Sequence, residues 1–167
     1  MKSWSWTETQ ALGVRAASGA GVPPAQALAF GAMLARHLAD DGAEAPLMRA
    51  LTAPDAVLGL AHRVETVVEQ ASVGGNSVTV EEADAGQRAL LISWLSALPC
   101  EADLSVTGNT ITAKLDLAAP SLRSRPARIT LSDDLAADLH ALASKTYVPD
   151  SDTSRASGAG AGLMELD

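Results

Sequence analysis

A cluster of polar side chains near the C-terminus is the part of the chain best equipped to bind a small molecule. Asp152, Ser154 and Arg155 follow one another closely, and Tyr147 precedes them. Arginine can hold a carboxylate through two parallel hydrogen bonds, and aspartate can take up or give a proton. The cluster therefore suits a polar metabolite, although the same composition is also typical of a solvated terminal segment.

Directly after this cluster the chain reads SGAGAGL, with glycine at every second position as Gly158, Gly160 and Gly162. A dinucleotide-binding loop needs a strand before such glycines and a helix after them, and too few residues follow for that helix. The glycines do leave the backbone free of side-chain bulk, so that it can lie flat against another surface. We expect Tyr147, the polar cluster and the glycines to form a binding segment without a cofactor.

The histidines give a weaker signal. His37 and Asp40 stand three positions apart on a predicted helix, where they could supply two metal ligands or a base and the group that orients it. His62 and His140 lie near apolar helix stripes and have no ligand spacing to each other. Two ligands do not complete a site, so we predict no metal site.

Cys100 is the single cysteine of the chain, which excludes an intrachain disulfide and suits a reducing compartment. The neighbouring carboxylate of Glu101 would disfavour a thiolate, so we expect Cys100 to be a small buried side chain. The patterns GxSxG and HExxH and the lysine pattern of phosphate-binding loops do not occur. These features favour a protein that is not an enzyme.

The charge of the chain indicates which partners it can bind. The formal net charge of −8 opposes binding to a phosphate backbone, so we predict no nucleic-acid partner. The one basic cluster consists of Arg123, Arg125 and Arg128 in the sequence SLRSRPAR. This cluster could hold an anion or an acidic partner, or it could be a solvated loop.

The N-terminus MKSWSWTETQ lacks the apolar region of a secretion signal. The longest apolar run, residues 89–100, is far shorter than the roughly 20 residues that cross a bilayer. We therefore expect a cytoplasmic protein that does not enter the membrane.

Residues 1–71 are predicted to be helical. Thr7 opens a capping-box pattern for a helix over residues 8–18, and Pro23 with Pro24 begins a second helix. Spacings of three and four residues place four apolar side chains on one face of that second helix, namely Ala27, Phe30, Leu34 and Leu38. A short helix over residues 46–51 and a longer one from Pro54 follow. The sequence SVGGNS, residues 72–77, marks a turn.

Residues 77–146 are predicted to mix strands and helices. Alternating patterns predict strands over residues 77–82, 103–117 and 128–131, and the middle range forms a hairpin at Gly108-Asn109 of type II′. On its second strand Ile111, Ala113, Leu115 and Leu117 share one face. Residues 85–98 favour a helix, and Ser132 caps a final helix.

These elements define an α+β fold, with N-terminal helices packed on a small, largely antiparallel sheet and with a C-terminal helix. We predict a single domain over residues 1–146 and a C-terminal strap or tail over residues 147–167.

Two stretches of sequence resemble a small uncharacterised bacterial family, a domain of unknown function. The first is ETQALGVRAASGAG, followed by a second alanine-rich helix, and the better match is TYVPDSDTSRASGAGAG. The family signature implied here is Tyr-x-Pro, then a Ser-Arg pair, then alternating glycines. The resemblance implies no activity, cofactor or catalytic residue, but it implies that residues 147–162 are more than a frayed end. The ending MELD departs from the family's more polar one.

Three functions follow as hypotheses. The leading one is a binding or accessory protein whose C-terminal segment docks on its own body or on a protein partner, self-association included. The second is a small lyase, isomerase or hydrolase of a polar metabolite that uses Asp152, Ser154 and Arg155. The third, which the acidic composition disfavours, is a winged-helix DNA reader.

Overall fold

The computed structural model describes residues 2–75 and 77–146 of the 167-residue chain, within which six helices and five strands form. In chain order they are β1 (Lys2–Trp4), α1 (Trp6–Gly19), α2 (Pro24–Ala39), α3 (Glu44–Thr52), α4 (Pro54–Gly74), β2 (Ser77–Glu81), α5 (Ala85–Ser96), β3 (Cys100–Thr107), β4 (Thr110–Pro120), β5 (Ile129–Leu131) and α6 (Asp133–Ser144). The predicted α+β class is confirmed. In this part of the chain no helix is long and apolar enough to cross a membrane.

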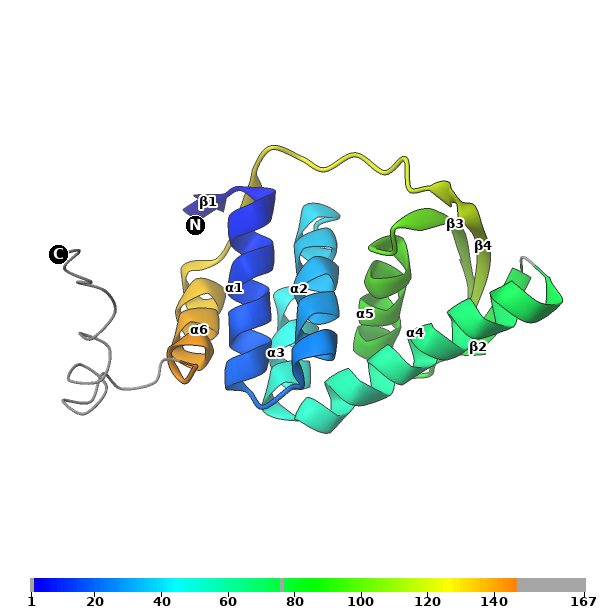
Figure 1. The fold of residues 1–167 in the computed structure, drawn as a ribbon. Helices are drawn as coiled ribbons and strands as arrows, with labels where there is room; N and C mark the ends of the chain where they lie inside the picture. Colours follow the sequence, from blue (N-terminus) through cyan, green and yellow to red (C-terminus); the bar gives the residue numbers. More distant parts are fainter. Residues whose placement is uncertain (1, 76, 147–167) are drawn as a thin grey trace, which may run out of the picture.

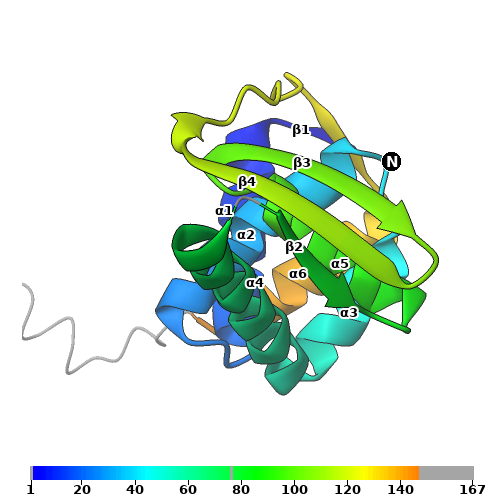
Figure 2. The same cartoon turned by 90° about the vertical axis from the view of Figure 1, so that its right-hand side faces the viewer.

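The helices stand in a row with a sheet at one end. Helices α6, α1, α2 and α5 lie side by side, and α4 begins below α2 and crosses beneath α5 toward the sheet (Figure 1). The sheet has the order β2-β4-β3 with antiparallel neighbours, and it faces the viewer in Figure 2. A second, two-stranded sheet pairs β1 with β5, so the first strand is tied to the segment just before α6.

Small side chains let the first two helices approach closely. Gly13 of α1 faces Gly31 of α2, because a Cβ atom on Gly13 would lie 3.1 Å from the Cα of Gly31. The predicted apolar stripe of α2 is confirmed, since Ala27, Phe30, Leu34 and Leu38 are all buried. Tight helix contact and a leucine-rich core therefore replace the aromatic bulk that this sequence lacks.

The start of α1 lies earlier than predicted. Ser5, not Thr7, caps the helix: its hydroxyl accepts from the backbone N–H of Glu8, whose carboxylate accepts from the N–H of Ser5 at 2.7 Å. These hydrogen bonds from Ser5 hold the pKa of Glu8 below its usual value. A lowered folded-state pKa stabilises the fold above the unfolded pKa near 4.5, and that contribution is lost as the pH falls further.

The Ser5→Ala substitution is expected to lower the free energy of unfolding by about 1 kcal/mol, because a helix donor loses its cap. Urea unfolding followed by circular dichroism measures this loss. Ser18→Ala is the matched control, since Ser18 is exposed on the same helix and caps nothing. Equal stabilities of the two variants would contradict the assigned cap.

The hairpin at Gly108-Asn109 is confirmed and joins β3 to β4. Gly108 has a φ of 59° whereas Asn109 has no positive φ, which fits the predicted type II′ turn. Ile111, Ala113 and Leu115 are buried as expected. Leu117 is not, because β4 extends past the helices that cover its inner face up to that point.

The other predicted elements also form. The short helix is α3, residues 85–96 form α5, and the hydroxyl of Ser132 accepts from the N–H of Leu135 at the start of α6. The turn predicted over residues 72–77 begins later, because α4 continues to Gly74. Buried residues of all six helices, and of both sheets, belong to one hydrophobic cluster.

Candidate functional site

The seven predicted binding residues lie outside the described residues. They are Tyr147, Asp152, Ser154, Arg155, Gly158, Gly160 and Gly162. The proposed roles of these residues stay predictions.

His37 and Asp40 do not act together in the structure. The His37 side chain is buried at 2% exposure, with Nδ1 2.8 Å from the Ser93 hydroxyl and Nε2 donating to the carbonyl of Ala43 at 2.9 Å. Asp40 instead accepts from Arg36 at 2.6 Å. A histidine held at both nitrogens positions the loop after α2, and offers no ring lone pair to a metal.

The structure also shows the surroundings of the other two histidines and of the cysteine. His62 is exposed on α4, and the ring of His140 lies 5.6 Å from that of Trp4. Cys100 is buried as predicted, and burial raises the pKa of its thiol. The carboxylate that adds to this rise is Asp116 of the neighbouring strand and not Glu101. Among the described residues no three His, Cys, Asp or Glu side chains gather as a metal site.

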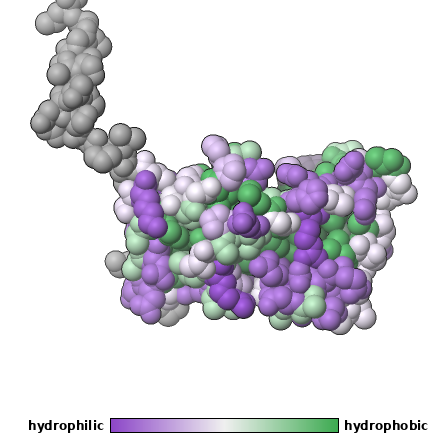
Figure 3. All heavy atoms as spheres, turned by 90° about the horizontal axis from the view of Figure 1, so that it is seen from below, coloured by the Kyte–Doolittle hydropathy of each residue, from purple (hydrophilic) through white to green (hydrophobic). Residues whose placement is uncertain are grey.

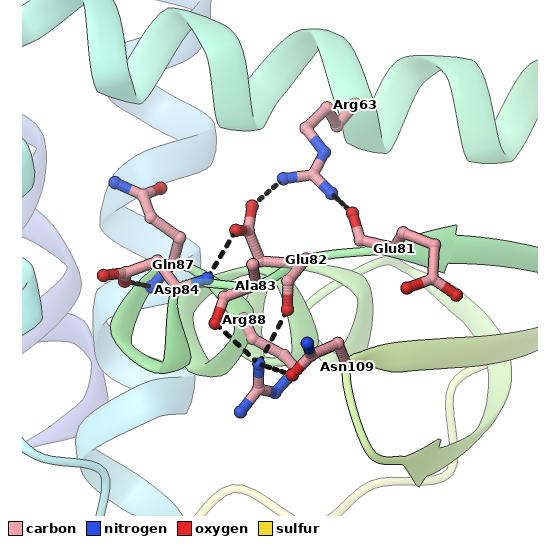
Figure 4. Close-up of polar contacts among 8 residues, drawn as sticks. All are labelled: Arg63, Glu81, Glu82, Ala83, Asp84, Gln87, Arg88 and Asn109. Atoms are coloured by element: carbon pink, nitrogen blue, oxygen red, sulfur yellow. Dashed lines mark hydrogen bonds and ion pairs between the residues drawn. The ribbon is translucent and has the colours of Figure 1, made fainter.

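A polar cluster around the connection between β2 and α5 stabilises the fold. Arg63 of α4 forms an ion pair with Glu82 and donates to the carbonyl of Glu81, while Arg88 of α5 donates to the carbonyl of Glu82 and to Asn109 (Figure 4). Arg63 thus ties the connection between β2 and α5 to α4, and Arg88 ties the same connection to the hairpin turn. These arginines are engaged within the fold.

The basic cluster predicted in the connection after β4 borders a real pocket of about 510 Å³. The pocket lies where the start of α1, the end of α2 and the end of α5 meet the segment between β4 and β5. Its lining residues are Trp6, Arg36, Ser96, Ala97, Leu98, Pro99, Pro120, Ser121, Arg123 and Arg125. We call it the arginine pocket. Arg128 does not line it, and donates instead to the Ser3 hydroxyl at 3.0 Å.

Three arginines converge in the arginine pocket. The guanidinium carbons of Arg36 and Arg125 each lie 5.3 Å from the centre of the Trp6 ring. Arg123 approaches Asp40 at 3.6 Å, the same carboxylate that binds Arg36. The indole ring of Trp6 thereby contacts two cations, and the Asp40 carboxylate offsets part of the positive charge.

Arg36 is the buried member of this group. It is 6% exposed, and it donates to the carbonyl of Ser124 at 2.9 Å, which fixes the basic connection above α2. Its Nε atom is buried without a hydrogen-bond partner. A buried donor without a partner is costly, and this cost adds to that of holding the Arg36 charge beneath the connection.

A second hollow, of about 400 Å³, lies between α2, α4 and α5. We call it the apolar groove. Its lining residues are Ala25, Gln26, Ala29, Ala61, Val64, Glu65, Val68, Glu69, Trp94 and Leu98. A shallow extension passes over Leu28, which is 59% exposed, to Pro99 at the edge of the arginine pocket. Other apolar patches also reach the surface between hydrophilic side chains, as the view from below shows (Figure 3).

Two carboxylates rim the apolar groove. Glu65 and Glu69 stand one helical turn apart on α4 and are both exposed, and neither side-chain carboxylate has a hydrogen bond or ion pair with another described residue. Like charges at this spacing repel each other by a few tenths of a kcal/mol. A cation bound at the rim would remove the repulsion.

Sequence reasoning missed Arg36 and Trp6 as neighbours of the basic cluster. The available signal was the pair Arg36 and Asp40, four positions apart at the end of an apolar helix. Comparison with known proteins found no matching family model, curated protein or solved structure.

Proposed function

We propose that this is a non-catalytic binding or accessory protein whose apolar groove binds its own C-terminal segment, residues 147–162. The observation that supports the proposal is an apolar channel between three helices with two unpaired carboxylates at its rim. Such a channel suits a segment that offers apolar contacts and a positive charge. The resemblance to the uncharacterised bacterial family stays a prediction and supports the same segment.

The groove lies within reach of this segment. Helix α6 ends beside the end of α1, where a Cβ atom on Gly19 would lie 2.7 Å from the carbonyl carbon of Leu142. Lys145 and Pro54 line one hollow there. From Pro54 to Ala61, at the start of the groove, α4 rises about 10 Å, whereas an extended segment over residues 147–162 spans about 50 Å.

The chemistry of the segment complements the groove. Arg155 supplies the cation for Glu65 and Glu69, and Tyr147 supplies a ring for the apolar wall. The alternating glycines let the backbone approach helix surfaces lined by Ala25, Ala29 and Ala61. Docking within one chain closes the groove, and docking between chains produces self-association.

A charge-reversal cycle tests this proposal. Glu65→Lys with Glu69→Lys is expected to raise amide exchange in residues 147–162 by about fivefold or more, because an ion pair of about 1 kcal/mol and its packing are lost. Adding Arg155→Glu to these substitutions is expected to restore protection. Hydrogen exchange with mass spectrometry gives the readout, and size-exclusion chromatography separates docking within a chain from self-association.

Glu101→Lys provides the matched control, because Glu101 is exposed on the outer face of the sheet. It changes the net charge without touching the groove. Exchange in residues 147–162 that is as fast in the parent protein as in a free peptide would overturn the proposal.

A further inference from the structure

We propose that the arginine pocket binds a small molecule that carries a multiply charged oxyanion group, either a phosphate or a set of carboxylates. This inference is independent of the proposed docking in the apolar groove. It assigns a ligand class to a pocket formed by α1, α2, α5 and the connection between β4 and β5.

The arrangement of donors carries the inference. Two nitrogens of Arg36 already donate hydrogen bonds, one to the Ser124 carbonyl and one to Asp40. These two hydrogen bonds fix the orientation of its guanidinium plane. Its Nε–H stays buried without an acceptor. An arginine fixed on the pocket wall can face an anion at little further entropic cost, because the entropy of ordering the side chain has already been lost on folding.

The two exposed arginines supply the remaining charge. Arg125 contacts the same Trp6 ring as Arg36, and Arg123 contacts the same Asp40 carboxylate, so all three border one pocket. Three guanidinium groups and one carboxylate leave a local excess of positive charge in a chain whose net charge is −8. Like charges gathered in this way repel one another until an anion joins them.

The shape of the pocket favours a small molecule. Its volume of about 510 Å³ is in the range of metabolite sites, roughly 300–1,000 Å³. Ser96 and Ser121 contribute hydroxyl groups to its wall, and Leu98, Pro99 and Pro120 contribute apolar surface. A charged head against the arginines and a compact body against the prolines would fill this space.

Binding of inorganic pyrophosphate and of citrate to the full chain tests the inference, by isothermal titration calorimetry at constant ionic strength. Pyrophosphate represents the phosphate source and citrate the carboxylate source, and saturable binding of either one is the expected result. The Arg123→Gln, Arg125→Gln double variant is expected to weaken that binding by about tenfold or more, because each arginine makes charge-assisted hydrogen bonds.

The control is Arg128→Gln, which removes one positive charge from the same connection, as each single variant Arg123→Gln and Arg125→Gln does, at a residue that does not line the pocket. It is expected to change the affinity by less than about twofold, as a screened remote charge does. Both exposed arginines lie outside the core, so their variants should fold. The inference is overturned if neither anion binds saturably, or if Arg128→Gln weakens binding as much as the double variant.

Discussion

Gly19→Ala is expected to lower the free energy of unfolding by about 3 kcal/mol, the upper part of the usual cost of overpacking. The added Cβ would overlap the carbonyl oxygen of Leu142 and lie 2.7 Å from its carbonyl carbon. Both obstructing atoms belong to the backbone of α6, so no change of side-chain rotamer relieves the overlap. Helix α6 must move away from α1, and its buried Leu139 then loses contact with the core.

Urea unfolding followed by circular dichroism measures this effect, and Gly59→Ala is its matched control. Gly59 lies within α4, and a Cβ atom there would meet nothing within 4 Å. Alanine at an open helical position is expected to raise stability by up to about 1 kcal/mol. The two substitutions should therefore act with opposite signs, and a stabilising Gly19→Ala would show that α6 does not pack against α1 as described.

His37→Ala is expected to lower the free energy of unfolding by about 3 kcal/mol. The substitution removes a buried ring together with its hydrogen bonds to the Ala43 carbonyl and the Ser93 hydroxyl. Truncation of a buried side chain of this size to alanine costs about 2–5 kcal/mol, chiefly through the cavity that it leaves. The His37 ring also fills the space beside Gly42, because a Cβ atom added to Gly42 would lie 2.6 Å from Cδ2 of His37. The loop between α2 and α3 should therefore loosen as well.

Thermal and urea unfolding check this prediction against His62→Ala, whose side chain is exposed and should matter by less than about 0.5 kcal/mol. Addition of Zn²⁺ distinguishes a structural His37 from a metal ligand. Because both ring nitrogens are engaged, Zn²⁺ is expected to leave the melting temperature of the parent protein unchanged. A metal-dependent rise that disappears in His37→Ala would contradict the structural role.

The arginine pocket shows why a site is harder to predict than its parts. The sequence predicts a basic cluster of Arg123, Arg125 and Arg128 that could hold an anion or an acidic partner, or could be a solvated loop. The significance of the first two comes from Trp6 and Arg36, which are about 90 to 120 positions away in the chain and whose neighbourhood depends on antiparallel packing of α1 against α2. Local patterns contain no information on such a meeting.

Helices, turns and caps that depend on neighbouring residues could be predicted from the sequence alone. The stripe of α2 with Phe30 and Leu34, the turn at Gly108 and the cap at Ser132 each depend on residues within a few positions, so periodicity and turn chemistry predicted them.

The remaining features depend on contacts in the tertiary structure. The strand β1 has only three residues and forms because Ser3 pairs with Thr130, and α1 is capped by Ser5 directly after that strand and not by the predicted Thr7. The burial of His37 and the convergence on Arg36 likewise required the folded chain, because contacts between residues far apart in sequence depend on how whole helices pack.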